Sequence, residues 1–349
     1  MDQLTILLRV VVPLSKILSF NHTRAASRLP SFSQPPSVRA MGLFWMFLKY
    51  NQRLLVYPDG FHFDNERREI MTPLEFFMPY EDVELRTKDK VTLRCYLMLQ
   101  TSKAARATVI MFHGNATNQG EVLDLAHRFH RANFHVFTLE YRGYGLSDGA
   151  PSESGIRLDA QAALDFVSGH PTLSQLPIVI YGQSLGGGVA IDATSRNSGK
   201  IKALIIENTF TSIPNVIKGW HVIGYFSFLA TQRWPSASRL ESIPASLPIL
   251  MLSGTLDAVI PQHHMHTLWD VASKRGQPKG NLLNAVTCGT MSRRGSMLVA
   301  EDEEVSGKEC GVPAVKDKFK KFSRGSHNDT CLQPEYWTTV FDFLDDILS

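Results

Sequence analysis

The stretch Gly182-Gln183-Ser184-Leu185-Gly186 decides the fold that we predict for this chain. The apolar run Pro177–Tyr181 precedes it and has the length of a buried strand. Two further glycines and the apolar Val189–Ile191 follow it, which indicates the start of a helix. Such a Gly-x-Ser-x-Gly motif between a strand and a helix is typical of a nucleophile elbow, whose turn is too tight for larger flanking side chains. The alternative is a glycine-rich loop that carries an ordinary serine.

Apolar runs alternate with helical patterns on both sides of this motif. The predicted strands are 107–112, 135–139, 177–181, 203–206, 247–252 and 319–322, and the predicted helices include 123–129, 156–167 and 336–347. Continuous apolar strands separated by helices predict a mostly parallel sheet that is covered on both faces. Two segments of alternating polarity, 83–86 and 91–99, precede this sheet and predict an antiparallel hairpin. We therefore expect an α/β fold.

The composition is that of a soluble globular domain with additional segments. Of the 349 residues, 44% are hydrophobic and 20% are charged, and the formal net charge is +3. This charge is too small to indicate nucleic-acid binding, and no basic stripe with interleaved aromatic residues is present in the sequence. The four cysteines fit neither a disulfide framework nor a zinc site; they are Cys95, Cys288, Cys310 and Cys331. We therefore expect no metal, no cofactor and no nucleic-acid partner.

Residues 1–58 form an N-terminal segment of distinct composition. No acidic residue occurs from Gln3 to Pro58, whereas seven basic residues do. Its two apolar stretches, Leu4–Leu18 and Met41–Leu48, are shorter than the roughly 18–20 uninterrupted apolar residues of a membrane-spanning helix. We favour a weak membrane anchor attracted to anionic lipid, at the endoplasmic reticulum or another endomembrane. A mitochondrial transit peptide and a disordered leader of a cytoplasmic protein are the alternatives.

The main domain is predicted over residues 80–349. Within it, residues 211–246 follow the carboxyl end of a strand, where α/β sheets bind ligands, and we interpret them as a small cap over Ser184. The candidate substrate-binding residues of this cap are Trp220, Tyr225, Phe226 and Phe228. The alternative is that these aromatic side chains bury the cap against the body. A polar insert without sustained periodicity, 276–316, is predicted to be disordered.

Ser184 needs a base that takes its proton and an acid that orients the base. Asp257 stands on the loop after the apolar strand 247–252, and His327 stands on the loop after 319–322. The order Ser, Asp, His along the chain is the one that accompanies this elbow. We therefore predict Ser184 as nucleophile, His327 as general base and acid, and Asp257 as the group that orients His327. Glu207, at the end of strand 203–206, is the alternative acid.

Other histidines are weaker candidates for the base. His263, His264 and His266 follow the Asp257 loop on a predicted helix, and we expect them at the surface. His113 precedes a glycine after its strand, and we expect it to fix a turn.

A reaction at Ser184 also needs two backbone donors for the oxyanion. We predict the N–H groups of Leu185, at the helix start, and of Asn115.

The combined motifs resemble those of a known superfamily. They are His113-Gly114-Asn115-Ala116, Tyr141–Gly145, Gly182–Gly187, Glu207–Phe210, Asp257 and His327–Thr330. Together they are similar to the α/β hydrolases, and more narrowly to the fungal bud-emergence (Bem-type) hydrolases and the animal α/β-hydrolase domain-containing proteins of type 13. The resemblance covers Leu54 to the C-terminus and implies a serine hydrolase with an N-terminal membrane anchor, often linked to cell polarity. The insert 276–316 departs from the family, in which the acid and histidine loops are closer in sequence.

We therefore expect an α/β-hydrolase fold and a serine hydrolase that cleaves an ester or thioester through an acyl-enzyme. The expected substrate is a small acyl or lipid-like molecule. An aminopeptidase-like amide hydrolase is one alternative. A scaffold that keeps the fold without catalysis, in cell polarity, is the other.

Overall fold

The computed structural model describes residues 52–57, 70–101, 103–219, 227–277 and 316–349. The expectations for residues 1–51, for Trp220, Tyr225 and Phe226, and for most of the insert 276–316 lie outside these ranges. Within the described ranges, no helix is both long enough and apolar enough to cross a membrane.

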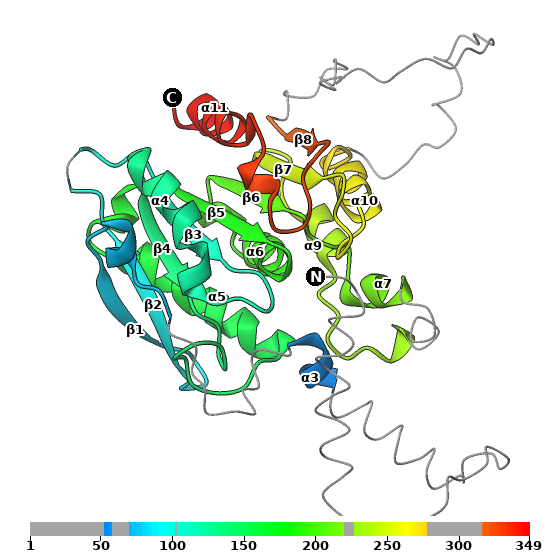
Figure 1. Cartoon of the computed structure of the whole chain (residues 1–349), viewed down its shortest axis with the longest axis horizontal. Helices are drawn as coiled ribbons and strands as arrows, with labels where there is room; N and C mark the ends of the chain where they lie inside the picture. Colours follow the sequence, from blue (N-terminus) through cyan, green and yellow to red (C-terminus); the bar gives the residue numbers. More distant parts are fainter. Residues whose placement is uncertain (1–51, 58–69, 102, 220–226, 278–315) are drawn as a thin grey trace, which may run out of the picture.

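An eight-stranded sheet forms the centre of the molecule (Figure 1). In the order in which they lie side by side, the strands are β1 (Glu81–Arg86), β2 (Thr92–Met98), β4 (His135–Leu139), β3 (Thr108–Phe112), β5 (Ile178–Gln183), β6 (Ala203–Glu207), β7 (Ile249–Gly254) and β8 (Lys318–Phe322). The pairs β1–β2 and β2–β4 are antiparallel, and all other neighbouring pairs are parallel. This arrangement confirms the predicted fold class, including the antiparallel hairpin at one edge.

Helices cover both faces of the sheet. The longer helices of the described residues, of nine residues or more, are α4 (Leu123–Arg131), α5 (Glu153–Gly169), α6 (Leu185–Arg196), α10 (His263–Ala272) and α11 (Tyr336–Leu348). Shorter elements are α3 (Gln52–Val56), α7 (Ile213–Lys218), α9 (Ser236–Glu241) and the 3-10 turns η3 (Pro73–Phe76), η4 (Gln119–Val122), η5 (Leu173–Gln175), η6 (Ser198–Lys200), η7 (Ser227–Leu229) and η8 (Thr330–Leu332). Helix α5 begins before the predicted 156 because the Ser152 hydroxyl accepts a hydrogen bond from the Gly155 N–H and caps it.

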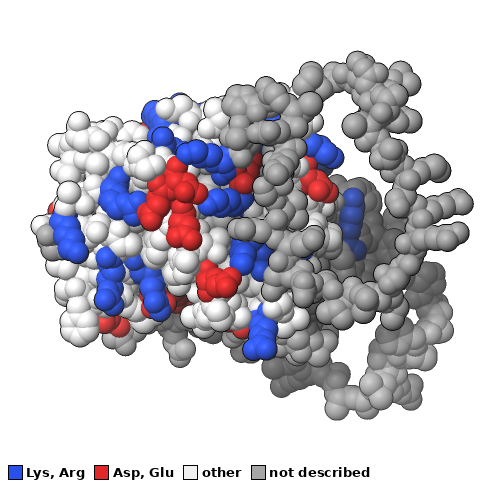
Figure 2. Space-filling model, turned by 90° about the horizontal axis from the view of Figure 1, so that it is seen from above, with Lys and Arg blue, Asp and Glu red and all other residues white. Residues whose placement is uncertain are grey.

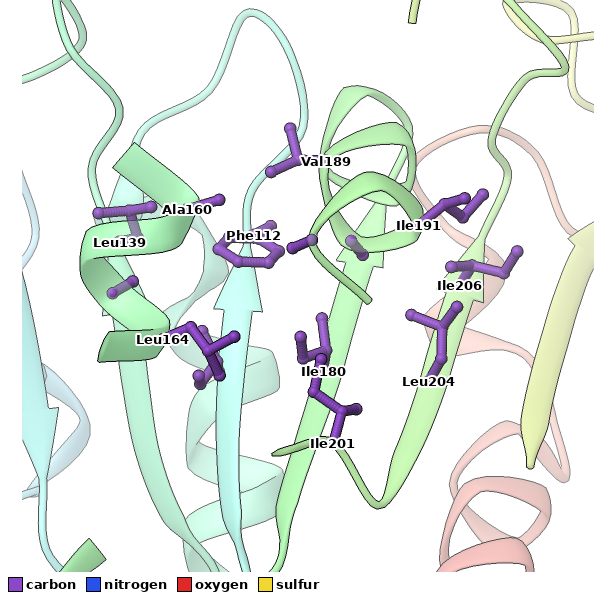
Figure 3. Close-up of a cluster of buried hydrophobic side chains, with 14 of the residues drawn as sticks. Phe112, Leu139, Ala160, Leu164, Ile180, Val189, Ile191, Ile201, Leu204 and Ile206 are labelled. Atoms are coloured by element: carbon purple, nitrogen blue, oxygen red, sulfur yellow. The ribbon is translucent and has the colours of Figure 1, made fainter. Parts of the chain in front are cut away.

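The two faces are built from alternate residues of the same strands. In β3, Ile110 and Phe112 face the core beneath α5 and α6, and Val109 and Met111 face the core beneath α4 and α11. Figure 3 shows the first of these cores, in which Phe112 lies near Val189 of α6. The strands are therefore buried on both faces, which explains their continuous apolar sequence.

Residues 52–57, from the predicted N-terminal segment, pack against the cap. The Gln52 amide donates to the Leu229 carbonyl at 2.7 Å, and its side-chain oxygen accepts from the Thr231 N–H. Tyr57 is fully buried, and its hydroxyl accepts a 2.8 Å hydrogen bond from the Trp234 indole N–H. Figure 1 shows α3 beside the cap and far from β1. Residues 52–57 therefore join the domain at the cap.

Surface charge of both signs is interspersed. On the face that Figure 2 shows, Lys and Arg side chains lie among Asp and Glu side chains. Several of the described charges form ion pairs, such as Lys318 with Asp346 at 2.6 Å and Lys320 with Glu335 at 2.9 Å. Exposed pairs of this kind contribute about 0–1 kcal/mol each, so the fold rests on its apolar core.

Candidate active site

The turn that carries Ser184 is strained and tightly packed. Ser184 has φ 55° and ψ −119°, a conformation that L-residues rarely adopt. A Cβ atom placed on Gly182 would lie 2.2 Å from the Gly186 carbonyl oxygen, so only glycine fits there. The Ser184 N–H donates to the Glu207 carbonyl at 3.0 Å. Ser184 therefore stands between β5 and α6 as the sequence predicts.

Three residues that are distant in the sequence meet at this turn. His327 Nε2 lies 3.0 Å from Ser184 Oγ, and His327 Nδ1 lies 2.7 Å from Asp257 Oδ2. The side chain of His327 is 12% exposed and that of Asp257 is 2% exposed, so water has little access to the imidazole–carboxylate contact. With the Nδ1 proton donated to Asp257, Nε2 is left as an acceptor that faces the serine hydroxyl.

Asp257 is itself held in place by its own loop. Its second oxygen, Oδ1, accepts from the N–H groups of Val259 and Ile260, each at 2.8 Å. One carboxylate oxygen is thus fixed by the backbone and the other contacts His327. The carboxylate is thus held in the orientation in which Oδ2 faces His327 Nδ1.

Glu207, the alternative acid, points into the opposite core. Its Oε2 accepts from the hydroxyls of Tyr181 at 2.6 Å and Tyr336 at 2.5 Å. Burial raises the pKa of Glu207 above its ordinary value, and the two tyrosine hydroxyls oppose that rise. Asp257 contacts the imidazole and Glu207 does not, so the geometry favours the first assignment.

The histidines of α10 differ from the expectation in one case. His263 and His266 are exposed, but His264 is only 2% exposed, and the surface prediction for it is wrong. Its Nδ1 accepts from the Thr211 N–H at 3.3 Å, and burial lowers the pKa of His264 to about 4. The helix turns this residue toward the cap, which a residue-by-residue reading of polarity does not indicate.

A cavity of about 350 Å³ lies beside the acid loop. It is lined by α7, by α10 and by the segment between β7 and α10, including Val216, Val259 and His264. The cap residues Thr211 and Val216 thus share an open cavity with Val259 of the acid loop.

The turn after β3 lies directly against the elbow. A Cβ atom on Gly114 would lie 2.7 Å from Gln183 Oε1 and 3.7 Å from Ser184 Cβ. Leu185 is the first residue of α6, so its N–H belongs to the set without a partner inside the helix. The two predicted oxyanion donors, Leu185 and Asn115, therefore sit on backbone segments that flank Ser184.

His113 stabilises the same turn. Its Nδ1 lies 2.8 Å from the Gly114 carbonyl oxygen, and its ring lies 4.1 Å from that of Tyr141. The Tyr141 hydroxyl donates to the His113 carbonyl at 3.0 Å. These contacts agree with a turn-fixing role, and the imidazole that contacts Ser184 Oγ is that of His327.

Sequence reasoning missed what holds Asn115. The Asn115 side chain donates to the Val56 carbonyl at 2.7 Å and accepts from the Tyr144 hydroxyl at 2.6 Å. Tyr144 belongs to one of the motifs that carry the family resemblance, but Val56 lies in the N-terminal segment 1–58, to which no part of the site was assigned. Since the contact joins residues 59 positions apart, no local pattern could have indicated it.

The described part of the cap carries one exposed and one buried large aromatic side chain. Phe228 is 68% exposed in η7. Trp234 is 1% exposed and bonded to Tyr57. Trp234 therefore buries the cap against the body, whereas Phe228 remains available to a substrate or a surface.

Comparison with known proteins shows the class of fold to which this chain belongs. A family model described as "Serine aminopeptidase, S33" matches residues 103–243. An esterase from Pyrococcus furiosus of known structure superposes with a TM-score of 0.60, at 17% identity, over 83% of this chain and 99% of its own. This likeness shows the α/β-hydrolase fold.

Relatives in sequence narrow the assignment. Protein bem46 of Schizosaccharomyces pombe is 40% identical over 305 residues, which cover 85% of this chain and 87% of the relative. An uncharacterized membrane protein of Saccharomyces cerevisiae is 31% identical over 299 residues, 85% of this chain and 90% of its own. The chain therefore belongs to the bem46-related family of α/β hydrolases.

Proposed function

We propose that this chain is a serine hydrolase that cleaves an ester or thioester with Ser184, His327 and Asp257. One observation carries the proposal: Nε2 of His327 lies 3.0 Å from Ser184 Oγ while Nδ1 lies 2.7 Å from Asp257 Oδ2. Both distances are those of hydrogen bonds in a nucleophile–base–acid relay.

In the first half-reaction, Ser184 Oγ attacks the acyl carbonyl carbon as its proton passes to His327 Nε2. The N–H groups of Leu185 and Asn115 donate hydrogen bonds to the negatively charged carbonyl oxygen. Each such donor stabilises the transition state by about 2.7–4 kcal/mol. The intermediate then collapses, and the bond to the alcohol or thiol breaks. The leaving group takes the proton from Nε2, and the acyl group stays on Ser184. Asp257 remains ionised throughout and stabilises the imidazolium.

In the second half-reaction, water replaces the leaving group. His327 Nε2 takes a proton from this water, whose oxygen attacks the acyl carbon. The Ser184–acyl bond breaks, the carboxylic acid leaves, and the proton returns from Nε2 to Ser184 Oγ. Each residue thus ends in its starting state.

The favoured substrate class is a moderately long acyl ester or thioester. The cavity beside the acid loop offers apolar contacts to an acyl chain through Val216 and Val259. Phe228 exposes a further apolar side chain on the cap. We also propose that residues 1–51 attach the protein to a membrane surface, because they combine apolar stretches with basic residues. The membrane protein of S. cerevisiae among its relatives supports this part.

Labelling of the full chain with a fluorophosphonate probe tests the chemistry. Wild type and Ser238→Ala, which changes an exposed serine of α9, should label, and Ser184→Ala should not. Equal labelling of Ser184→Ala would reject the nucleophile. No labelling of wild type would favour a non-catalytic scaffold.

A substrate series then tests the class. We expect p-nitrophenyl esters and acyl thioesters of increasing chain length to turn over, with a maximum at intermediate or long chains. Turnover of aminoacyl anilides alone would favour an aminopeptidase-like amide hydrolase instead.

Attachment to membranes is tested by sedimentation with vesicles. The full chain should pellet with phosphatidylcholine–phosphatidylserine vesicles and less with pure phosphatidylcholine, and high salt should weaken the electrostatic part. Absence of binding to both vesicle types would reject this part.

A further inference from the structure

The side-chain amides of two residues contact the main-chain carbonyl oxygen of His327. Gln183 Nε2 donates to it at 2.8 Å. Asn208 Nδ2 lies 3.2 Å from it and shares its two N–H groups among this carbonyl and two further acceptors of the same loop. Gln183 directly precedes Ser184, and Asn208 directly follows β6. Two elements of the sheet thus hold one atom of the histidine loop. We call Gln183 and Asn208 the amide pair.

Asn208 also connects the histidine loop to the acid strand. Its Nδ2 lies within hydrogen-bonding distance of the Ser326 carbonyl, at 3.1 Å, and of the Thr330 hydroxyl, at 3.0 Å. Its Oδ1 accepts from the Gly254 N–H at 2.8 Å, and Gly254 ends β7 three residues before Asp257. One side chain therefore contacts the end of the strand that precedes the acid loop and the part of the histidine loop that carries His327.

Asn208 is suited to this position by its backbone as well. It is 1% exposed and has φ 43°, a left-handed conformation that asparagine adopts more readily than most residues. A buried amide with every polar atom bonded is a rigid support.

The contacts to Asp257 and to the amide pair constrain His327 differently. The Nδ1 contact fixes the rotation of the ring, but it does not fix where the histidine backbone lies. The amide pair holds that backbone at the carbonyl, and the 3.0 Å distance from Nε2 to Ser184 Oγ depends on it. A displacement of about 1 Å in such a relay costs about 100-fold in rate.

We propose that Gln183 and Asn208 are positioning residues. Their side-chain amides donate hydrogen bonds to the main-chain carbonyl of His327 and thereby hold its imidazole at Ser184. The inference rests on the proposed function, because it assigns the pair a role in the Ser184–His327 relay. Neither residue touches the reacting atoms in this scheme.

The test compares two backgrounds, wild type and His327→Ala. Gln183→Met removes one donor with little change of shape, and Asn208→Gly removes the other while permitting φ 43°. Gln161→Met is the matched control, because the Gln161 amide on α5 donates to Asn197, which lies at the end of α6 opposite to Ser184. The measured quantity is the second-order rate constant for fluorophosphonate labelling of the full chain, well below each variant's melting temperature.

We expect Gln183→Met and Asn208→Gly each to slow labelling by about 10- to 100-fold in the wild-type background, and Gln161→Met to leave it unchanged. In the His327→Ala background the same changes should slow the residual labelling by less than about 2-fold, since residues that act as a unit are not additive. Equal slowing in both backgrounds, or no difference between Gln183→Met and Gln161→Met, would overturn the proposal. If His327→Ala itself labels like wild type, the proposed function fails instead. Gln183→Met alone decides the question if Asn208→Gly does not fold.

Discussion

Gly186 offers a direct way to separate the two halves of the predicted oxyanion site. A Cβ atom at this position would lie 2.0 Å from the Phe112 carbonyl oxygen and 2.6 Å from that of His113. Real Cβ atoms essentially never approach closer than 3.0 Å, and the neighbours here are backbone atoms that cannot rotate away. In Gly186→Ala, α6 and the turn after β3 must therefore separate by about 1 Å, the scale on which a catalytic arrangement loses about 100-fold.

This separation affects function and stability together. Leu185 lies on the α6 side and Asn115 on the β3 side, so their N–H groups move apart. We expect fluorophosphonate labelling to slow by about 100-fold. We also expect the free energy of unfolding in urea to fall by about 1–3 kcal/mol from overpacking.

Gly199→Ala is the matched control. No atom lies within 4 Å of a Cβ at Gly199, in η6. Its labelling should match wild type and its stability should change by less than about 1 kcal/mol. If Gly186→Ala matched Gly199→Ala in both measurements, the steric reasoning would be refuted.

Three further predictions concern stability. His264 stays neutral in the folded chain because burial lowers its pKa to about 4, while the unfolded chain binds a proton below about 6.5. Stability measured in urea should therefore fall as pH drops through this window, by at most about 1.4 kcal/mol per pH unit from this group, and His264→Asn should lack that slope. Glu207 should change stability with pH in the opposite direction. Burial raises the pKa of Glu207 in the folded chain, so its contribution to the free energy of unfolding is lost as the pH rises above 4.5. Glu207→Gln should therefore reduce the loss of stability on that side of the pH profile. A pH profile identical to wild type would contradict either assignment. Tyr57→Phe leaves the buried Trp234 N–H without its acceptor and should cost about 1–3 kcal/mol, with an unchanged urea midpoint as the contrary result.

Local patterns in the sequence were sufficient for most of the fold. The elbow needs glycine at 182 and 186 because backbone atoms occupy the space of a side chain, and this requirement is visible as a motif. Strands buried on both faces read as continuous apolar runs, so β3 to β7 were predicted within one to two residues. Placing Asp257 and His327 after strand ends was enough to predict that they meet Ser184, since parallel strands end at one edge of the sheet.

Contacts between distant segments were decided only by the tertiary structure. His264 and His263 are neighbours of identical chemistry, yet the packing of α10 buries one and exposes the other. Val56 supports Asn115, and Tyr57 supports Trp234, across 59 and 177 positions. The sequence by itself determined the candidate catalytic residues, because short motifs indicate both their side-chain chemistry and the turns on which they lie. The three-dimensional packing decided which groups hold them, because a hydrogen bond depends on distance in space and not along the chain.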